Sequence, residues 1–332
     1  MLRYGMRYTA LAAVLVLLCS VAPAARTWRL KDGEKWESAN ATPREQYALK
    51  VAKLKDLVQS GEADAVEETL AELKDKFPQY VGPDLDLFVA GELQYWKDRY
   101  AKAMKQYEKL LKDYPGSEYA PAVLDREYDM AAAYLGGRKK KVLGFLKISG
   151  HAEGIELMER ISDRAGLDEP NSVGLKAAVA VAEHYEAREK YLEAYLKWSE
   201  VASYWETGPV GKRALLRMAE DNLLAYNQPP AKRRPLLDAS KLVTAKTYYQ
   251  KYATLYPNEV KPYKIAEKIK QIDELMAHKQ LTVGKYYHRV GKTSAARLYF
   301  ETVVRDWPKT EAADLAREAL EETAAETEAR GK

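Results

Sequence analysis

The sequence predicts an all-α fold, an α-solenoid of about five helix–turn–helix repeats that ends in a capping helix. The clearest evidence lies between Leu281 and Pro308, where two helical patterns are separated by the turn Val290-Gly291-Lys292. Small and aromatic residues recur at the same distances before several other prolines. No strand alternation persists over a long stretch of the chain. Repeats of this kind bury a core by stacking on their neighbours.

The C-terminal repeat shows which positions matter. Counting back from Pro308, Gly284, Tyr287, Ala296 and Phe300 lie 24, 21, 12 and 8 residues earlier. We expect the small residues where the two helices cross closely, and the aromatic ring in the gap to the next helix. The proline ends the unit because it cannot continue a helix. This spacing is that of a tetratricopeptide repeat (TPR), a unit of ~34 residues.

The same offsets find further repeats, each at a predicted helix end. Counted from Pro115, Glu206, Pro257 and Pro78, the residues at these offsets are Gly91, Gln94, Ala103 and Tyr107; Ala182, Tyr185, Ala194 and Trp198; Ala245 and Tyr249; Val66 and Leu70. Gln94 does not fit the pattern, but Tyr95 lies beside it. Glu206 stands where a proline is expected, and the last two sets match in the second helix only. The sequence therefore predicts five repeats, three of them with both helices recognisable.

Residues 1–25 have the features of a secretory signal peptide. Arg3 and Arg7 precede the apolar run Thr9–Leu18, which is too short to span a bilayer, and small residues follow. Cys19, the only cysteine, lies inside this segment. The alternative is lipidation of Cys19 as in bacterial lipoproteins, although the small residue normally found before such a cysteine is absent. We favour export without the lipid.

The remaining chain divides into a lead-in and the repeats. Residues 26–41 are expected to be extended, and residues 42–332 form the TPR-like α-solenoid. Thr42, Pro43 and Glu45 have the pattern of a capped helix start. At the other end, Thr310 to Ala329 is rich in Ala and Glu, and we expect it to be the terminal cap that a solenoid needs.

Two segments interrupt the repeats. Residues 138–170 begin with four basic residues, and Val142 to Ile148 is the one stretch where a short hairpin is plausible. The basic residues could touch anionic lipid or an acidic partner, but a solvated helix end is the interpretation we favour. Residues 227–235 form a proline-rich loop that lengthens one repeat. Such insertions lie on one face of a solenoid.

The sequence holds no sign of catalysis. Its 53 basic and 49 acidic residues leave a net charge of +4, which is too balanced to indicate nucleic-acid binding. The four histidines, His151, His184, His278 and His288, have no cysteine or second histidine at metal-ligand spacing. Zinc-protease, nucleophile-elbow and phosphate-loop motifs are missing. We expect no enzyme, no cofactor and no metal.

Two stretches point to a family. Tyr286 to Pro308 combines a tyrosine pair, a glycine turn, Ala-Ala-Arg and an aromatic–proline end, and Leu111 to Pro121 reads LKDYPGSEYAP. From about Pro43 to Leu320 the chain resembles the outer-membrane assembly lipoproteins of the BamD (YfiO) type. The resemblance implies a non-catalytic periplasmic scaffold, associated with the outer membrane, that helps insert β-barrel proteins into that membrane. A generic TPR adaptor of the cell envelope, of the Tol-Pal or cell-wall coordinator type, is the alternative.

The resemblance also suggests partners. Its C-terminal repeats would contact the barrel-assembly core subunit, and its N-terminal repeats would receive the targeting strand of unfolded outer-membrane proteins. Membrane association would come from a lipid anchor or from a partner.

TPR spacing places candidate binding residues on the first helix of a repeat. They are Leu85, Phe88, Glu92 and Tyr95 in the N-terminal repeats, and His278, Leu281, Lys285 and His288, followed by Arg289, in the last repeat. The first set is apolar and aromatic and would suit an aromatic-ended strand. The second is more basic and would suit an acidic partner. Alternatively, Phe88 and Tyr95 pack on the neighbouring helix pair.

Overall fold

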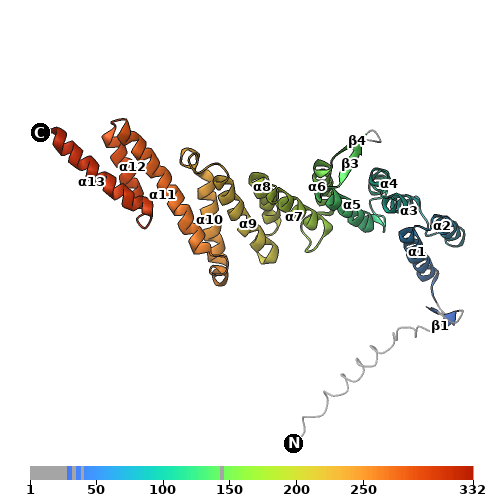
Figure 1. Cartoon of the computed structure of the whole chain (residues 1–332). Coiled ribbons are helices and arrows are strands. Elements are labelled where there is room, and N and C mark those ends of the chain that lie inside the picture. Colours follow the sequence, from blue (N-terminus) through green and yellow to red (C-terminus); the bar gives the residue numbers. More distant parts are fainter. Residues whose placement is uncertain (1–27, 32–34, 39–40, 143–145, 332) are drawn as a thin grey trace, which may run out of the picture. The chain divides into compact units, whose positions relative to one another are not determined.

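The computed structural model describes residues 28–31, 35–38, 41–142 and 146–331, and it divides into two compact units, residues 1–123 and 124–332. The signal peptide and Cys19 lie outside the described residues. Figure 1 labels the helices and strands of both units.

The first unit consists of a short hairpin followed by antiparallel helix pairs. Its elements are β1 (Trp28–Lys31), β2 (Lys35–Ser38), α1 (Pro43–Ser60), α2 (Ala63–Lys76), α3 (Pro83–Trp96), α4 (Tyr100–Asp113) and the start of α5 (Ala120–Leu135). The capped start of α1 has the predicted form: Thr42 Oγ1 accepts from the Glu45 N–H at 3.3 Å, and the Glu45 carboxylate accepts from the Thr42 N–H at 2.8 Å.

The hairpin corrects one expectation. The lead-in is extended, as expected, but its two halves pair antiparallel, with Trp28 opposite Ser38 and Lys31 opposite Lys35. The sequence did not indicate this pairing because each strand has only four residues, too few for a period-two pattern to stand out.

The second unit continues the helix pairs to a final single helix (Figure 1). Its elements are β3 (Lys139–Val142), β4 (Leu146–Ser149), α6 (His151–Ala165), α7 (Val173–Glu186), α8 (Tyr191–Tyr204), α9 (Gly208–Asn227), α10 (Ser240–Leu255), α11 (Ile265–Arg289), α12 (Thr293–Asp306) and α13 (Glu311–Gly331), with short 3₁₀ turns at Arg234–Leu236 and Pro257–Glu259. The all-α TPR solenoid is confirmed.

The predicted repeat positions form the core. The small residues and the aromatic residues of the second helices are all buried: Ala103, Ala194, Ala245 and Ala296, and Tyr107, Trp198, Tyr249 and Phe300. A Cβ atom on Gly284 would lie 2.5 Å from a Phe300 ring carbon, so the first helix can pass only because that residue has no side chain. Gly91 is in the same position beneath the ring of Tyr107.

Residues 138–170 contain α6, the second helix of a further helix pair whose first helix is α5. Gly154 on α6 faces α5, and a Cβ there would lie 3.0 Å from the Ala131 carbonyl oxygen. Met158 and Ile161 are fully buried, four and seven residues after Gly154. This is the spacing of Ala296, Phe300 and Val303 in α12, so α6 is the second helix of a repeat. The segment therefore belongs to the solenoid in large part.

The connection between α5 and α6 holds the insertion itself. It contains the antiparallel strands β3 and β4, with Lys139 opposite Ser149 and Val142 opposite Leu146. A hairpin was plausible at Val142 to Ile148, and the structure has one whose strands begin earlier, at Lys139, and end at Ser149. It lengthens the distance between the two helices of the pair, which is why fixed offsets failed to recognise them.

The chain's last described helix is a cap, as predicted. α13 buries Ala312, Ala313 and Ala316 against the preceding pair, in one cluster with Ala296, Phe300 and Val303. Thr310 Oγ1 accepts from the Ala313 N–H at 3.2 Å, which satisfies one of the free donors at the start of the helix.

Candidate functional site

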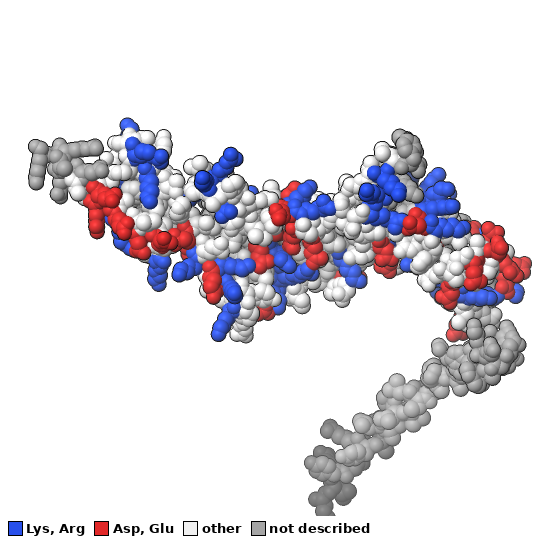
Figure 2. Space-filling model, viewed as in Figure 1, with Lys and Arg blue, Asp and Glu red and all other residues white. Residues whose placement is uncertain are grey.

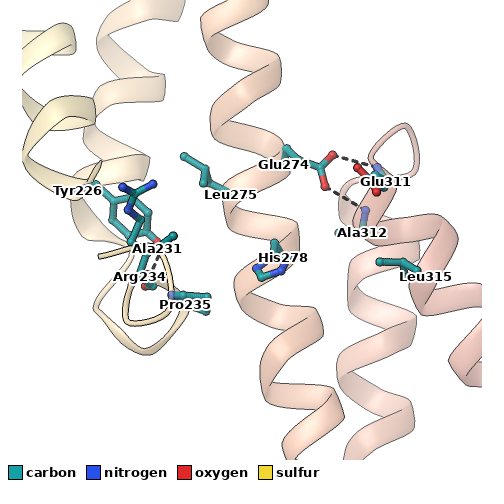
Figure 3. Close-up of a pocket in the computed structure, with 10 residues that line it drawn as sticks. All are labelled: Tyr226, Ala231, Arg234, Pro235, Glu274, Leu275, His278, Glu311, Ala312 and Leu315. Carbon is teal, nitrogen blue, oxygen red and sulfur yellow. Dashed lines mark hydrogen bonds between the residues drawn. The ribbon is translucent and has the colours of Figure 1, made fainter. Parts of the chain in front are cut away.

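A pocket of about 390 Å³ opens in the second unit between the end of α9, the loop after it, α11 and α13. Figure 3 shows the lining side chains converging from these four parts of the chain: Tyr226, Ala231, Arg234, Pro235, Glu274, Leu275, His278, Glu311, Ala312 and Leu315. Apolar side chains with a few polar groups among them are typical of ligand-binding clefts in proteins.

The proline-rich loop forms one wall of the pocket. Tyr226 donates from its hydroxyl to the Arg234 carbonyl at 2.9 Å, and Arg234 Nε donates to the Pro229 carbonyl at 2.8 Å. Lys279 on α11 donates to the carbonyls of Pro235, at 3.0 Å, and Leu237. The loop is thus held against α11, and the wall exists before a ligand arrives.

Glu274 forms the opposite wall and has a structural task. Its two carboxylate oxygens accept from the backbone N–H groups of Glu311 and Ala312, at 2.9 and 3.0 Å (Figure 3). A carboxylate at a helix start satisfies free donors and interacts well with the helix dipole. Glu274 therefore fixes α13 against α11, and its charge is already used within the fold.

A basic strip continues from the pocket along α11. His278, Lys285 and Arg289 are exposed, and spacings of seven and four residues put them on one face of a helix with 3.6 residues per turn. His288 is half-buried, and Leu281 is buried in the core. Of the basic groove predicted for the last repeat, the structure thus leaves His278, Lys285 and Arg289 exposed.

Most of the N-terminal candidate residues are buried in the interior of the first unit. Leu85, Phe88 and Glu92 are buried. The Phe88 ring stacks on Tyr119 at 5.0 Å between centroids and 17° between planes, and Glu92 accepts from the Tyr107 hydroxyl at 2.5 Å. This geometry favours the packing alternative over a ligand groove for these three residues.

Tyr95 differs from its three companions. It is half-buried and stacks on Tyr100 at 5.7 Å, next to Trp96, which is exposed. Of the N-terminal candidates, it is therefore the one with surface to offer a ligand.

The structure brings two histidines together that the sequence kept apart. The rings of His151 on α6 and His184 on α7 lie 5.3 Å apart, and Arg188 contacts His151. Burial, followed by the Arg188 charge, lowers the pKa of His184. A neighbouring guanidinium disfavours a metal ion, and the described residues hold no cluster of three or more metal-ligating side chains.

Sequence reasoning missed most of the pocket. His278 was expected in a groove, but Arg234, Glu274 and Leu315 were not, because each comes from a different element. The available signal was the loop at 227–235, whose extra length indicated an elaborated face.

In residues 41–142 and 146–331, no helix combines the length and apolarity that a bilayer crossing requires.

Comparison with known proteins agrees with this description. Residues 223–331 match the family YfiO, described as outer membrane lipoprotein, and residues 87–117 match a tetratricopeptide repeat family. No curated protein matches the chain.

Two solved structures show a weak likeness. One is the C-terminal part of a TPR repeat-containing protein from Cytophaga hutchinsonii, with 14% identity, a TM-score of 0.34, and 83% of this chain and 87% of that chain covered. The other is a tetratricopeptide repeat protein from Parabacteroides merdae, with 15% identity, a TM-score of 0.32, and 84% and 99% covered. The helix pairs give the chain a tetratricopeptide repeat fold, and its residues 223–331 are similar to the YfiO family of outer membrane lipoproteins.

Proposed function

We propose that the chain is a non-catalytic periplasmic scaffold of the BamD kind, which binds protein partners during assembly of outer-membrane β-barrel proteins. One observation carries the proposal. Every residue that lines the pocket, together with Lys285 and Arg289, falls within the 223–331 stretch that matches the outer membrane lipoprotein family. The pocket and the basic strip thus lie in the part of the chain that is similar to this family.

The chemistry of this surface favours a particular partner segment. Leu275 and Leu315 line the pocket with apolar surface, and the pocket has room for one or two side chains. Arg234 and His278 in the pocket, and Lys285 and Arg289 beyond it, are basic. The segment we propose is a loop of the barrel-assembly core subunit with an apolar anchor and acidic residues beside it. Apolar anchors supply most of the affinity, and the charges guide the encounter.

The N-terminal unit has a smaller part in the proposal. Because Leu85, Phe88 and Glu92 are buried, Tyr95 with the neighbouring Trp96 is the surface we propose for an aromatic-ended targeting strand of an unfolded outer-membrane protein. The two rings lie 5.2 Å apart, edge to face. Aromatic pairs of this kind can accept a further ring.

Export is also part of the proposal. Residues 1–25 would direct the chain to the periplasm, and Cys19 would be either removed with them or lipidated. In the alternative function, the same pocket serves a TPR adaptor of the Tol-Pal or cell-wall coordinator type, whose partner differs although its mode of binding is the same.

Site-specific crosslinking tests the proposal. A photo-reactive amino acid replaces His278 in the pocket, and in a matched control it replaces Lys251, which is exposed on α10 away from the pocket. We expect the His278 position to capture the barrel-assembly core subunit in intact envelopes and the control not to do so. Capture of Tol-Pal components instead would establish the alternative. Equal crosslinking from both positions would remove the pocket from the proposal.

A charge reversal measures how much the basic strip contributes to the affinity for the partner. Lys285→Glu with Arg289→Glu should weaken binding of the captured subunit at least tenfold, about 1.4 kcal/mol, with the helical circular dichroism kept. Lys251→Glu with Lys261→Glu changes the charge equally at exposed positions outside the strip and should leave the affinity within about twofold. An unchanged affinity for the strip variant would contradict its role.

A further inference from the structure

The β3–β4 hairpin exposes side chains that the proposed partner site does not use. All four residues of β4 are exposed. Leu146 keeps 49% of its surface in solvent and Ile148 keeps 44%. A two-stranded hairpin is marginally stable in water by itself, and a surface that covered these two apolar side chains would stabilise it.

The strand register sorts the hairpin into two faces. Lys140 pairs with Ile148, and Lys139 pairs with Ser149. Because directly paired residues share a face and alternate residues return to it, Leu146 and Ile148 lie on one face with Lys140. Lys139 and Lys147 lie on the other face. The hairpin is therefore amphipathic, with an apolar side and a basic side.

The charged residues in and around the hairpin are all positive. Residues 130–152 contain five basic residues, Arg138, Lys139, Lys140, Lys141 and Lys147, and no acidic residue. The whole chain has a net charge of +4, so the remaining residues together carry −1. The protein's net positive charge thus comes from this one segment. Figure 2 shows Lys and Arg gathered beside the hairpin.

One lysine anchors the hairpin, and two remain available. Lys140 forms an ion pair with Glu153 at the start of α6, which ties the hairpin base to the helix. Among the described residues, no carboxylate pairs with Lys139 or Lys147. The hairpin thus has a fixed base and a basic face open to an external anion.

The arrangement of the two faces distinguishes the kinds of anion. An acidic polypeptide bound to Lys139 and Lys147 would leave Leu146 and Ile148 in water. A membrane surface satisfies both faces at once, since apolar side chains enter the acyl boundary while long lysine side chains reach back to the phosphates. Each lysine near an anionic surface contributes about 1 kcal/mol.

We propose that the β3–β4 hairpin is a docking site for an anionic phospholipid surface, with Leu146 and Ile148 entering the bilayer interface and Lys139 and Lys147 contacting lipid phosphates. This site is separate from the partner pocket and does not depend on the proposed function.

Vesicle flotation with the purified protein tests this. The probes are vesicles of phosphatidylcholine alone and vesicles of equal parts phosphatidylcholine and phosphatidylglycerol. We expect binding to the anionic vesicles that weakens as salt is added. Lys139→Gln with Lys147→Gln should reduce the binding constant about thirtyfold, corresponding to about 2 kcal/mol. Leu146→Ser with Ile148→Ser should reduce the binding constant for anionic vesicles about tenfold. Binding of this variant is measured with both vesicle compositions.

A matched control separates this site from general charge. Lys251→Gln with Lys261→Gln removes the same charge at exposed positions away from the hairpin and should leave binding within about twofold. Because the hairpin side chains are exposed, the variants should fold, and thermal melts check this.

Three results would overturn the proposal. The first is that the protein does not bind anionic vesicles. The second is that the hairpin lysine variant and the control variant lose binding equally. The third is that the variant with Leu146→Ser and Ile148→Ser binds as well as the parent. Binding of soluble polyglutamate, lost in the Lys139 and Lys147 variant, without binding to vesicles would assign the basic face to an acidic polypeptide instead.

Discussion

Gly284 on α11 lies directly beneath the ring of Phe300 on α12, so close that a Cβ on the glycine would stand 2.5 Å from a ring carbon. Both residues are buried. The contact closes the last helix pair and connects with the cluster that holds the capping helix α13. The stability of the C-terminal third, where the pocket lies, therefore depends on this crossing.

Gly284→Ala should destabilise the protein although alanine favours helices. Overpacking costs about 1–3 kcal/mol, and the gain in helix propensity returns at most about 1 kcal/mol. Gly116→Ala is the control, because nothing lies within 4 Å of a Cβ there. Thermal melts should show a lower midpoint for Gly284→Ala alone. A higher midpoint than the parent's would mean that the helices do not cross so closely.

Phe88→Ala should destabilise the first unit by about 3–5 kcal/mol, since it empties a buried site stacked on Tyr119. Tyr95→Ala, at a half-buried position, should cost clearly less. Chemical denaturation monitored by circular dichroism compares the two. If Phe88→Ala kept the parent's stability but lost affinity for barrel targeting peptides, the groove interpretation would be right and the packing interpretation wrong.

Glu274→Ala should loosen the cap helix. It removes the acceptor for two backbone N–H groups at the start of α13, a change that costs about 1 kcal/mol at a helix N-terminus. Amide hydrogen exchange should be faster in α13 and little changed in α7 and α8. Glu318→Ala, at an exposed position within α13, is the control. Equal exchange in the two variants would contradict the capping role.

Asp221 should make stability depend on pH. It is 1% exposed on α9, and its Oδ2 has no hydrogen-bond partner among the described residues. Burial, reinforced by the charge of Glu186, raises the pKa of its carboxyl group to about 8. Arg217 opposes this rise in the pKa, and Glu220 contributes to it.

Whether stability rises or falls with pH follows from the number of protons that the folded and unfolded states bind. Between the ordinary aspartate pKa of about 4 and about 8, the folded protein holds a proton that the unfolded chain releases, so stability falls as pH rises. Asp221→Asn removes this dependence. Its melting midpoint should exceed the parent's at about pH 8, with the difference shrinking toward about pH 5. A parent whose stability does not fall across this range would show that Asp221 is ionised in the folded state.

The repeat register could be predicted from the sequence because it reflects a local requirement. Two helices that cross closely need a small residue at the crossing and a large one beside it, as with Gly284 and Phe300, and helical geometry sets their spacing. The α5–α6 pair obeys the same rule through Gly154, Met158 and Ile161. It went unrecognised because the β3–β4 hairpin changes the distance between its two helices.

The sequence by itself thus determined the helical class, the repeat spacing, the capped start at Thr42 and the final capping helix. Tertiary structure alone decided which faces remain open. Phe88 has the spacing of a groove residue, yet the ring of Tyr119 covers it. The pocket joins Tyr226, Glu274 and Leu315, which lie dozens of residues apart. Helical periodicity states which residues share a face, whereas burial of that face depends on contacts between elements that no local pattern records.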